Sequence, residues 1–241
     1  MNSWSARALL PAESWDTLFE ARALRLPALL EREAARAMAE QVLAAREQWT
    51  EDFGGAQFSL GRAFYTHLET GRERHYFKDA SKADLRVEAV LPGMQAGVRA
   101  LVAAFVAEPT LPRPGFCGPG VHVFLPGCEV AKKGGSVHFD LEGLRDDAER
   151  GSPALSLVIM LRPADEGGGL RIFPGRFSGS HRATAAESKA PFETLAYDAG
   201  DAIVFESQRL HQIEPFAGAS PRISITAHAL RRPEGLWHVW F

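Results

Sequence analysis

The 241-residue chain contains only two cysteines, Cys117 and Cys128, and no long apolar run. Two cysteines cannot build a disulfide framework or fill a four-ligand zinc site by themselves. A single bridge between them stays open at this point. The richest apolar stretch, Leu101–Ala107, is far shorter than the roughly 18 residues that a membrane-spanning helix needs. Residues Met1–Trp15 lack a cationic segment followed by an apolar run, so we expect no secretory signal and a cytoplasmic protein.

Neither sign of charge is in excess, because 27 Lys and Arg residues face 30 Asp and Glu residues, for a formal net charge of −3. Nucleic-acid binding requires a concentrated basic excess, so we expect no nucleic-acid partner. We also expect no membrane partner, while monomer and homodimer both stay open. With 46% hydrophobic and 24% charged residues, the composition excludes a disordered or coiled-coil chain.

The first 107 residues show a mainly helical pattern. Phe19–Leu26 predicts a first strand, and Pro27 suits the opening of a helix that runs from Ala28 to about Gln48. The segment 56–82 follows no clear period. The expected apolar face of the first helix consists of Leu30, Ala34, Ala37, Met38, Val42 and Ala45. A second helix is expected after Pro92-Gly93, with an apolar face of Met94, Val98, Leu101, Val102 and Phe105.

After residue 107 the pattern changes to short strands between Gly and Pro turns, which indicates a sandwich or barrel. No internal repeat or low-complexity linker interrupts the chain. We therefore predict one domain over residues 1–241, in which a helical region (1–107) supports a β-rich core (108–241). The predicted strands are Val121–Leu125, Ser136–Asp140, Ala154–Leu161, Leu170–Phe173, Glu193–Tyr197, Ala202–Phe205 and Arg222–Leu230.

Candidate metal ligands lie in the β-rich part. His138 and Asp140 are two residues apart on a predicted strand, so both side chains face the same side. His211 follows the apolar run Ala202–Phe205. Two imidazoles and one carboxylate form a facial triad that binds Fe(II) and leaves coordination positions open, whereas a structural zinc site fills its fourth position. Taken alone, the His-x-Asp pair is better explained as a solvated or capping pair.

A candidate anion site follows the second histidine. Arg222 and Ser224 also share one face of a predicted strand. A guanidinium with a nearby hydroxyl offers a charged fork and one further donor, which suits a carboxylate. Taken alone, Arg222 is better explained as an ordinary strand arginine bound to a local acid.

Taken together, the His-x-Asp pair, the distant His211 and the Arg-x-Ser pair resemble the Fe(II)/2-oxoglutarate-dependent oxygenases, in particular the prolyl-hydroxylase-like group. Gly168–Pro174 resembles the Gly-Gly-x-x-x-Phe turn and strand of that group, and Gly200–Phe205 resembles its Gly-Asp-Ala-x-x-Phe strand. The resemblance covers roughly residues 120–230. It implies an α+β fold with a double-stranded β-helix (jelly roll) core and supporting N-terminal helices.

The resemblance also implies roles for individual residues. His138, Asp140 and His211 are the expected catalytic Fe(II) ligands, and Arg222 with Ser224 is expected to bind the distal carboxylate of 2-oxoglutarate. His122, on the preceding strand, is the candidate for a further contact with this co-substrate; a structural histidine satisfied by hydrogen bonds is the other interpretation. O2 is the second co-substrate, and succinate and CO2 are the expected co-products.

The carboxylate of Asp140 also bears on the reaction type. Halogenating relatives have a small residue at this position, so hydroxylation is favoured here. Desaturation, epoxidation and ring closure use the same ligands and stay open.

The substrate is less well defined. Size and ligand spacing are similar to those of small stand-alone amino-acid hydroxylases related to lysine halogenases, so we expect a small-molecule substrate such as a free amino acid. Residues 53–78 are candidates to line its pocket. The aromatic tail 237–241 is expected to pack on the core, with closure over the site or a dimer contact as alternatives. The candidate substrate-binding residues are Arg74, Glu129, Glu142 and Trp237.

Three other functions are alternatives to a small-molecule oxygenase. A peptidyl (prolyl) hydroxylase acting on a protein uses the same ligands but needs an open groove. A non-catalytic jelly-roll binding module has no reason to hold the five site residues in this order. A zinc hydrolase is not supported, because the sequence contains no His-Glu-x-x-His motif.

Overall fold

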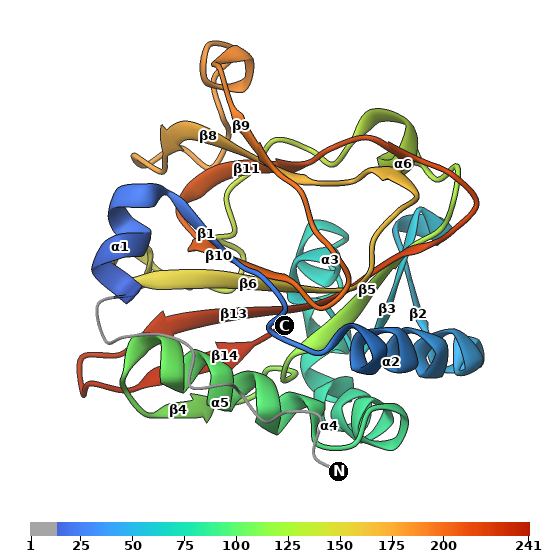
Figure 1. Cartoon of the computed structure of the whole chain (residues 1–241). Coiled ribbons are helices and arrows are strands. Elements are labelled where there is room, and N and C mark those ends of the chain that lie inside the picture. Colours follow the sequence, from blue (N-terminus) through green and yellow to red (C-terminus); the bar gives the residue numbers. More distant parts are fainter. Residues whose placement is uncertain (1–13) are drawn as a thin grey trace.

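The core of the molecule is a large, mainly antiparallel β-sheet with helices on one side (Figure 1). The computed structural model describes residues 14–241 of the chain. The strand order is β1–β10–β6–β13–β5–β3–β2, and β14 pairs with β13 and runs parallel to β4. The bounds are β1 Ala23–Leu26, β2 Thr50–Asp52, β3 Gln57–Leu60, β4 Thr110–Pro112, β5 Gly120–Phe124, β6 Ala154–Arg162, β10 Ala202–Glu206, β13 Arg222–Arg231 and β14 Trp237–Trp240.

A smaller sheet lies opposite the large one. It contains β11 (Arg209–Ile213), β8 (Leu170–Arg176) and β9 (Glu193–Leu195), and a separate two-stranded ladder joins β12 (Phe216–Ala217) to β7 (Glu166–Gly167). In Figure 1, β8, β9 and β11 form the upper layer and β6 and β13 lie below them. Two opposed sheets in a mixed chain agree with the predicted α+β, jelly-roll class.

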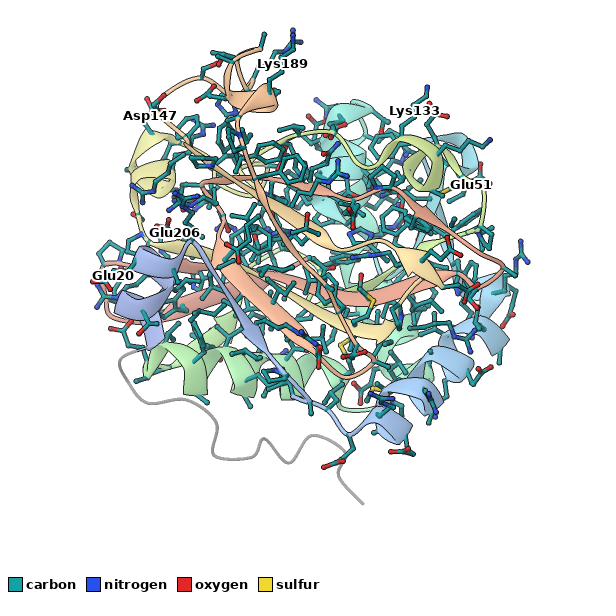
Figure 2. The ribbon with its side chains drawn as sticks, turned by 45° about the horizontal axis from the view of Figure 1, so that its top comes forward. Glu20, Glu51, Lys133, Asp147, Lys189 and Glu206 are labelled. Atoms are coloured by element: carbon teal, nitrogen blue, oxygen red, sulfur yellow. The ribbon has the colours of Figure 1, made fainter. Side chains whose placement is uncertain are left out.

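Helices cover the outer face of the large sheet. In Figure 1, α2 and α5 lie below it, and their apolar residues, such as Val42 and Val102, join one hydrophobic cluster with Leu157 and Ile225 of the sheet. Charged residues such as Lys133 and Lys189 point outward (Figure 2). The bounds are α1 Ser14–Ala21, α2 Arg32–Ala44, α3 Phe64–Glu69, α4 Glu73–Val90, α5 Met94–Val106, α6 Glu129–Lys133 and α7 Asp147–Gly151, with short 3-10 turns at Arg46–Gln48, Phe53–Gly55 and Glu187–Lys189.

Strand alternation decides which side chains reach the space between the sheets. On β13, Ile223 and Ile225 pack into the cluster shared with the helices. Arg222, Ser224 and Thr226 have the opposite parity and line the internal cavity. The large sheet therefore has a dry outer face under the helices and a polar stripe on its inner face.

Several N-terminal predictions need correction. The segment Phe19–Leu26 is not one strand, because α1 extends to Ala21 and β1 begins at Ala23. The next helix begins at Arg32 rather than Ala28, since the chain from Pro27 first turns back toward the sheet and the backbone N–H of Leu30 donates to the carbonyl of Gly200 at 2.9 Å. The residues buried on this helix are Ala35, Met38, Ala39 and Val42, so the predicted positions Ala34 and Ala37 are not in the core.

Other elements show both agreement and difference. The predicted apolar face of α5 is confirmed, because Met94, Val98, Leu101, Val102 and Phe105 are all buried. The unassigned segment 56–82 forms β3, α3 and most of α4. Ser136–Asp140 is wrong as a strand: it contributes only an isolated bridge between His138 and His211, and the following backbone is held by Ser207 instead. Six predicted strands are confirmed as β5, β6, β8, β9, β10 and β13, with small differences at their ends.

Both cysteines are free. Cys117 is buried, and the Cys128 sulfur accepts the backbone N–H of Ala131 at the start of α6. None of the helices in residues 14–241 is by itself long and apolar enough to cross a membrane, although the pair α4–α5, bent by 96°, passes that test of length and composition together.

The Gly200-Asp201 turn fastens the N-terminal strand to the sheet. Gly200 has φ of +94°, and a Cβ placed there lies 2.2 Å from the Leu30 carbonyl oxygen, so a larger residue does not fit. The buried Asp201 carboxylate accepts the backbone N–H groups of Ala28 (2.8 Å) and Asp198 (2.9 Å) and pairs with Arg25 (2.5 Å). Part of the motif that carried the family resemblance therefore has a structural role.

We expect Asp201→Ala to lower the free energy of unfolding by about 2–4 kcal/mol, because two backbone N–H groups lose their acceptor. Urea unfolding followed by circular dichroism measures the change. The neighbouring Asp198 is the matched control, since 64% of its side chain is exposed, and Asp198→Ala should change stability by less than about 0.5 kcal/mol. Equal losses of unfolding free energy in the two variants would show that the Asp201 carboxylate does not stabilise this turn.

Candidate active site

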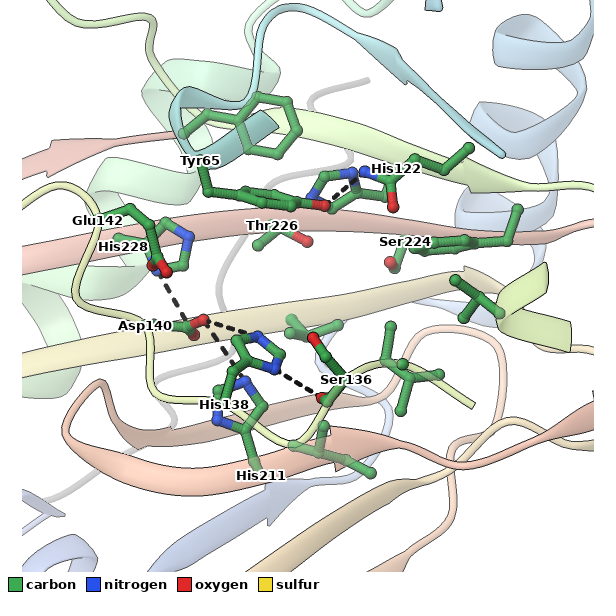
Figure 3. Close-up of a pocket in the computed structure, with 18 of the residues that line it drawn as sticks. Tyr65, His122, Ser136, His138, Asp140, Glu142, His211, Ser224, Thr226 and His228 are labelled. Atoms are coloured by element: carbon green, nitrogen blue, oxygen red, sulfur yellow. Dashed lines mark hydrogen bonds and ion pairs between the residues drawn. The ribbon is translucent and has the colours of Figure 1, made fainter. Parts of the chain in front are cut away.

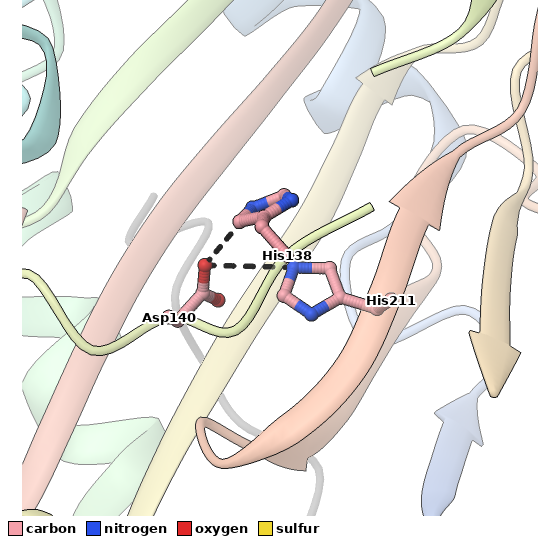
Figure 4. Close-up of side chains that lie close together, drawn as sticks. All are labelled: His138, Asp140 and His211. Carbon is pink, nitrogen blue, oxygen red and sulfur yellow. Dashed lines mark ion pairs between the residues drawn. The ribbon is translucent and has the colours of Figure 1, made fainter. Parts of the chain in front are cut away.

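Three of the predicted residues converge between the sheets. The Nε2 atoms of His138 and His211 lie 3.3 and 3.4 Å from Oδ1 of Asp140, and the three ligand atoms lie within 4.8 Å of one another (Figure 4). The backbones of the two histidines exchange hydrogen bonds of 3.0 Å, which brings their ring centroids to 4.3 Å. The Asp140 N–H donates to the Ser207 carbonyl at 2.9 Å. Backbone pairing thus sets the spacing of all three side chains.

Hydrogen bonds orient both imidazole rings. His138 Nδ1 lies 2.8 Å from the Ser136 carbonyl oxygen, and His211 Nδ1 lies 2.9 Å from the Arg209 carbonyl oxygen. A carbonyl can only accept, so each Nδ1 carries the proton and donates. Each Nε2 is left facing the carboxylate, and once it is deprotonated its lone pair is available to a metal, which is the tautomer that a metal-binding histidine requires. This donor set fits a divalent transition metal such as Fe(II).

The charges at this point are strongly coupled. Burial opposes ionisation of Asp140, but the imidazoles of His211, His228 and His138 outweigh it and hold the pKa of this carboxyl well below its usual range. Burial likewise lowers the pKa of His138, while the hydrogen bond and charge of Asp140 raise it to about 9. A cation bound between these atoms replaces imidazole protons, so metal binding here releases protons.

Ser156 and His228 surround the other oxygen of Asp140, and neither was singled out from the sequence. Ser156 Oγ donates to Asp140 Oδ2 at 2.6 Å and lies 3.0 Å from His228 Nδ1, which is itself 3.7 Å from Oδ2. The signal was present: Ser156 interrupts an apolar strand, and His228 lies in phase with Arg222 and Ser224 on β13. These contacts leave Oδ1 facing the two Nε2 atoms.

We expect Ser156→Ala to weaken Fe(II) binding by about tenfold or more, the usual cost of losing a hydrogen bond to a metal-ligating group. Anaerobic Fe(II) titration monitored by calorimetry measures this without relying on turnover. Ser178→Ala, at an exposed position, is the control and should bind iron like the parent. Unchanged affinity in Ser156→Ala would show that this hydroxyl does not hold the carboxylate.

A cavity of about 280 Å³ contains the three residues (Figure 3). The predicted residues that line it are His122, Glu129, Glu142, Arg222 and Ser224 together with His138, Asp140 and His211. The segment 53–78 contributes Phe53, Ala56, Gln57, Phe64, Tyr65 and Glu69.

Two predicted substrate-binding residues lie elsewhere. Arg74 is exposed on α4 and does not line the cavity. Trp237 is 1% exposed in the core under the helices, and its indole N–H donates to Glu108 at 2.7 Å. Because side chains alternate along β14, Trp240 faces the cavity instead, followed by the terminal Phe241. The tail packs on the core, as expected, and also lines the cavity.

Arg222 is 2% exposed and has no acidic partner among residues 14–241. Its Nε donates to the Gly168 carbonyl at 3.0 Å and one terminal nitrogen contacts Ser224 Oγ at 3.4 Å. Burial lowers its pKa. The Tyr197 hydroxyl is buried in the same cavity beside this guanidinium and forms no other hydrogen bond in the described residues. A buried guanidinium that lacks a carboxylate, beside a hydroxyl with spare hydrogen-bonding capacity, fits an anionic ligand such as the distal carboxylate of 2-oxoglutarate.

His122 and Glu142 lie on the cavity wall in different environments. His122 pairs in register with Ser224, is 7% exposed, and has no partner for Nδ1 among the described residues. Burial lowers its pKa to about 3, so the imidazole is neutral near pH 7. Burial, and then the charge of Asp140, raises the pKa of Glu142 to about 7. Glu129 is exposed and pairs with Lys133.

Comparison with protein families decides the class. Residues 128–229 match the family model described as the 2OG-Fe(II) oxygenase superfamily. The β-rich part of the chain that contains the candidate site thus matches this superfamily. The match includes His138, Asp140, His211 and Arg222, and the family resemblance inferred from the sequence is confirmed. The oxygenase is thus an enzyme that depends on Fe(II) and 2-oxoglutarate.

Solved structures show the same fold. An N-substituted L-amino acid dioxygenase from Burkholderia ambifaria AMMD, in complex with α-ketoglutarate, is 16% identical over 95% of this chain and 91% of its own, with a TM-score of 0.60. The carbocyclase SnoK from nogalamycin biosynthesis is 20% identical over 92% and 84%, with a TM-score of 0.56. The epimerase SnoN from the same biosynthesis is 19% identical over 92% and 87%, with a TM-score of 0.54. No curated protein sequence matches the oxygenase.

Proposed function

We propose that this oxygenase hydroxylates an unactivated C–H bond of a small molecule and forms succinate and CO2 as co-products. His138, Asp140 and His211 hold the Fe(II) ion. The observation that carries the proposal is the convergence of two imidazole Nε2 atoms and one carboxylate within 4.8 Å in the cavity that also contains Arg222. Three protein ligands leave coordination positions open for a co-substrate.

The other cavity residues have roles that follow from their contacts. Arg222 binds the distal carboxylate of 2-oxoglutarate, with the hydroxyls of Ser224 and Tyr197 as further donors. His122, which has an unused ring nitrogen beside Ser224, is a further contact for the co-substrate. Fe(II) and 2-oxoglutarate, when bound, supply the activation of O2 that side chains cannot provide. Aromatic side chains such as Phe205, whose ring centroid lies 4.5 Å from that of His211, keep water from the ligands.

A free amino acid or a related metabolite is the proposed substrate class. The dioxygenase of similar fold is described as acting on N-substituted L-amino acids, which supports a small-molecule substrate. The N-terminal region supplies Gln57, Tyr65 and Glu69 to the same cavity. This supports the proposal that residues 1–241 work as one oxygenase domain, although residues 1–13 lie outside the described part.

The test has two stages. Fe(II) and 2-oxoglutarate are added without oxygen, and a metal-to-ligand charge-transfer band is expected if the triad holds iron beside the co-substrate. Oxygen is then admitted with a library of free amino acids, related metabolites and proline-containing peptides, and succinate is measured. Absence of both the band and succinate would sink the oxygenase assignment. Release with peptides alone would replace the small-molecule proposal with peptidyl hydroxylation.

A further inference from the structure

The cavity wall carries more glutamates than lysines and arginines, even without the ligand Asp140. Glu69, Glu129 and Glu142 line it, whereas Arg222 is the one lysine or arginine among its described lining residues. Glu129 already pairs with Lys133 on α6. Glu69 and Glu142 form no ion pair with lysine or arginine in residues 14–241. Two carboxylates therefore lack a countercharge.

Iron and co-substrate do not supply that countercharge. The two positive charges of Fe(II) and the two negative charges of 2-oxoglutarate offset each other, and Arg222 offsets Asp140. The loaded cavity still contains the carboxyl groups of Glu69 and Glu142, and no lysine or arginine of the described lining pairs with either. A half-buried carboxylate without a partner is unfavourable, and a bound cation relieves this cost. The charge balance therefore favours a positively charged substrate.

The position of Glu142 suits a substrate group close to the iron. It lies two residues after Asp140, and Figure 3 shows it beside His228, on the same side of the cavity as Asp140. Glu69 lies at the exposed rim, and its charge contributes to the electrostatic environment of Glu142. A cation that enters past Glu69 thus reaches Glu142 next to the metal ligands.

Two uncharged features also indicate an amine ligand. Tyr65, Phe64 and Phe241 line the same cavity, and aromatic faces next to carboxylates are suited to alkylammonium groups. His122 is more than nine-tenths buried and lines the cavity, and its Nδ1 lacks a partner among the described residues, so it can hydrogen-bond to the co-substrate or to a substrate amine.

We propose that the substrate of this oxygenase carries a cationic amine and that Glu142, assisted by Glu69, binds it. The inference rests on the proposed function and, within its small-molecule class, favours related amine metabolites over free amino acids. A substrate carboxylate finds no second cation in the cavity, because Arg74 is exposed on α4 and Arg222 serves 2-oxoglutarate. Amines without a free carboxylate near the amino group therefore fit better than simple zwitterions.

The experiment compares cyclohexylamine, cyclohexanol and cyclohexanecarboxylate, which share a ring and differ in charge. Each is titrated without oxygen into protein loaded with Fe(II) and 2-oxoglutarate, and binding is followed by calorimetry and by changes in the charge-transfer band. Cyclohexylamine should bind at least about tenfold more tightly than cyclohexanol, the effect of one hydrogen bond to a charged group. Cyclohexanecarboxylate should bind most weakly.

Glu142→Gln should erase the preference for the amine, whereas Glu47→Gln, an exposed position outside the cavity, should retain it. The inference is overturned if the carboxylate binds as tightly as the amine, or if a folded Glu142→Gln protein keeps the preference. If Glu142→Gln does not fold, the three probes on the parent protein decide alone. If the charge-transfer band is absent, the proposed function fails, and calorimetry with the same probes still tests the charge preference separately.

Discussion

Asp140→Ala is expected to abolish stable Fe(II) binding and to lower 2-oxoglutarate turnover by more than about a hundredfold. Loss of a group that merely supports a metal ligand already costs about 10–100-fold, and Asp140 is proposed as a ligand itself. Its Oδ1 is the atom that both imidazole Nε2 atoms approach, at 3.3 and 3.4 Å. Removing it leaves two neutral donors and no charge to offset Fe(II). Anaerobic titration followed by the charge-transfer band measures binding, and succinate release measures turnover.

The matched control for this change is Asp147→Ala, whose carboxylate is fully exposed on α7. It should bind iron and release succinate like the parent. Asp140→Asn separates charge from size, because the amide keeps the shape and loses the negative charge. Circular dichroism excludes misfolding, since removing a bound metal also removes its stabilisation. Unchanged turnover in a folded Asp140→Ala protein would show that Asp140 is not an iron ligand.

The convergence of the candidate ligands could be predicted from sequence because its information is local. His138 and Asp140 are separated by one residue, and Arg222 and Ser224 follow the alternation of a strand that the apolar pattern identifies well. Even so, the reason given for the first pair was wrong. His138 and Asp140 do not lie on a regular strand; one bridge to His211 and one backbone bond to Ser207 place them. The predicted convergence of the three side chains is still observed, because those contacts turn His138 and Asp140 toward His211.

The parts that failed depend on contacts between distant segments. The buried face of α2 depends on how the helix docks against β6, and its start is positioned by the hydrogen bond between Leu30 and Gly200. In the aromatic tail, composition cannot tell Trp237 from Trp240. Their different environments follow from the pairing of β14 with β13 and β4, which gives them opposite faces. The register of β14 is set by its pairing with strands that are distant in the sequence, so a local sequence pattern cannot predict it.

Arg222→Ala is expected to raise the Kd for 2-oxoglutarate by at least about thirtyfold while Fe(II) still binds, because truncating one partner of a buried charge pair costs about 2–5 kcal/mol. The guanidinium is 2% exposed and has no acidic partner among residues 14–241, so a carboxylate bound there loses its main countercharge in the variant.

Comparing 2-oxoglutarate with 2-oxopentanoate, which lacks the distal carboxylate, isolates this contact. The parent should prefer 2-oxoglutarate, Arg222→Ala should lose the preference, and Arg222→Lys should retain only part of it, since lysine lacks the planar fork. Arg74→Ala, on the exposed face of α4, should behave like the parent. If a variant without Arg222 still prefers 2-oxoglutarate, another group binds the distal carboxylate. Arg222 would then have only a structural role, through its hydrogen bond to the Gly168 carbonyl.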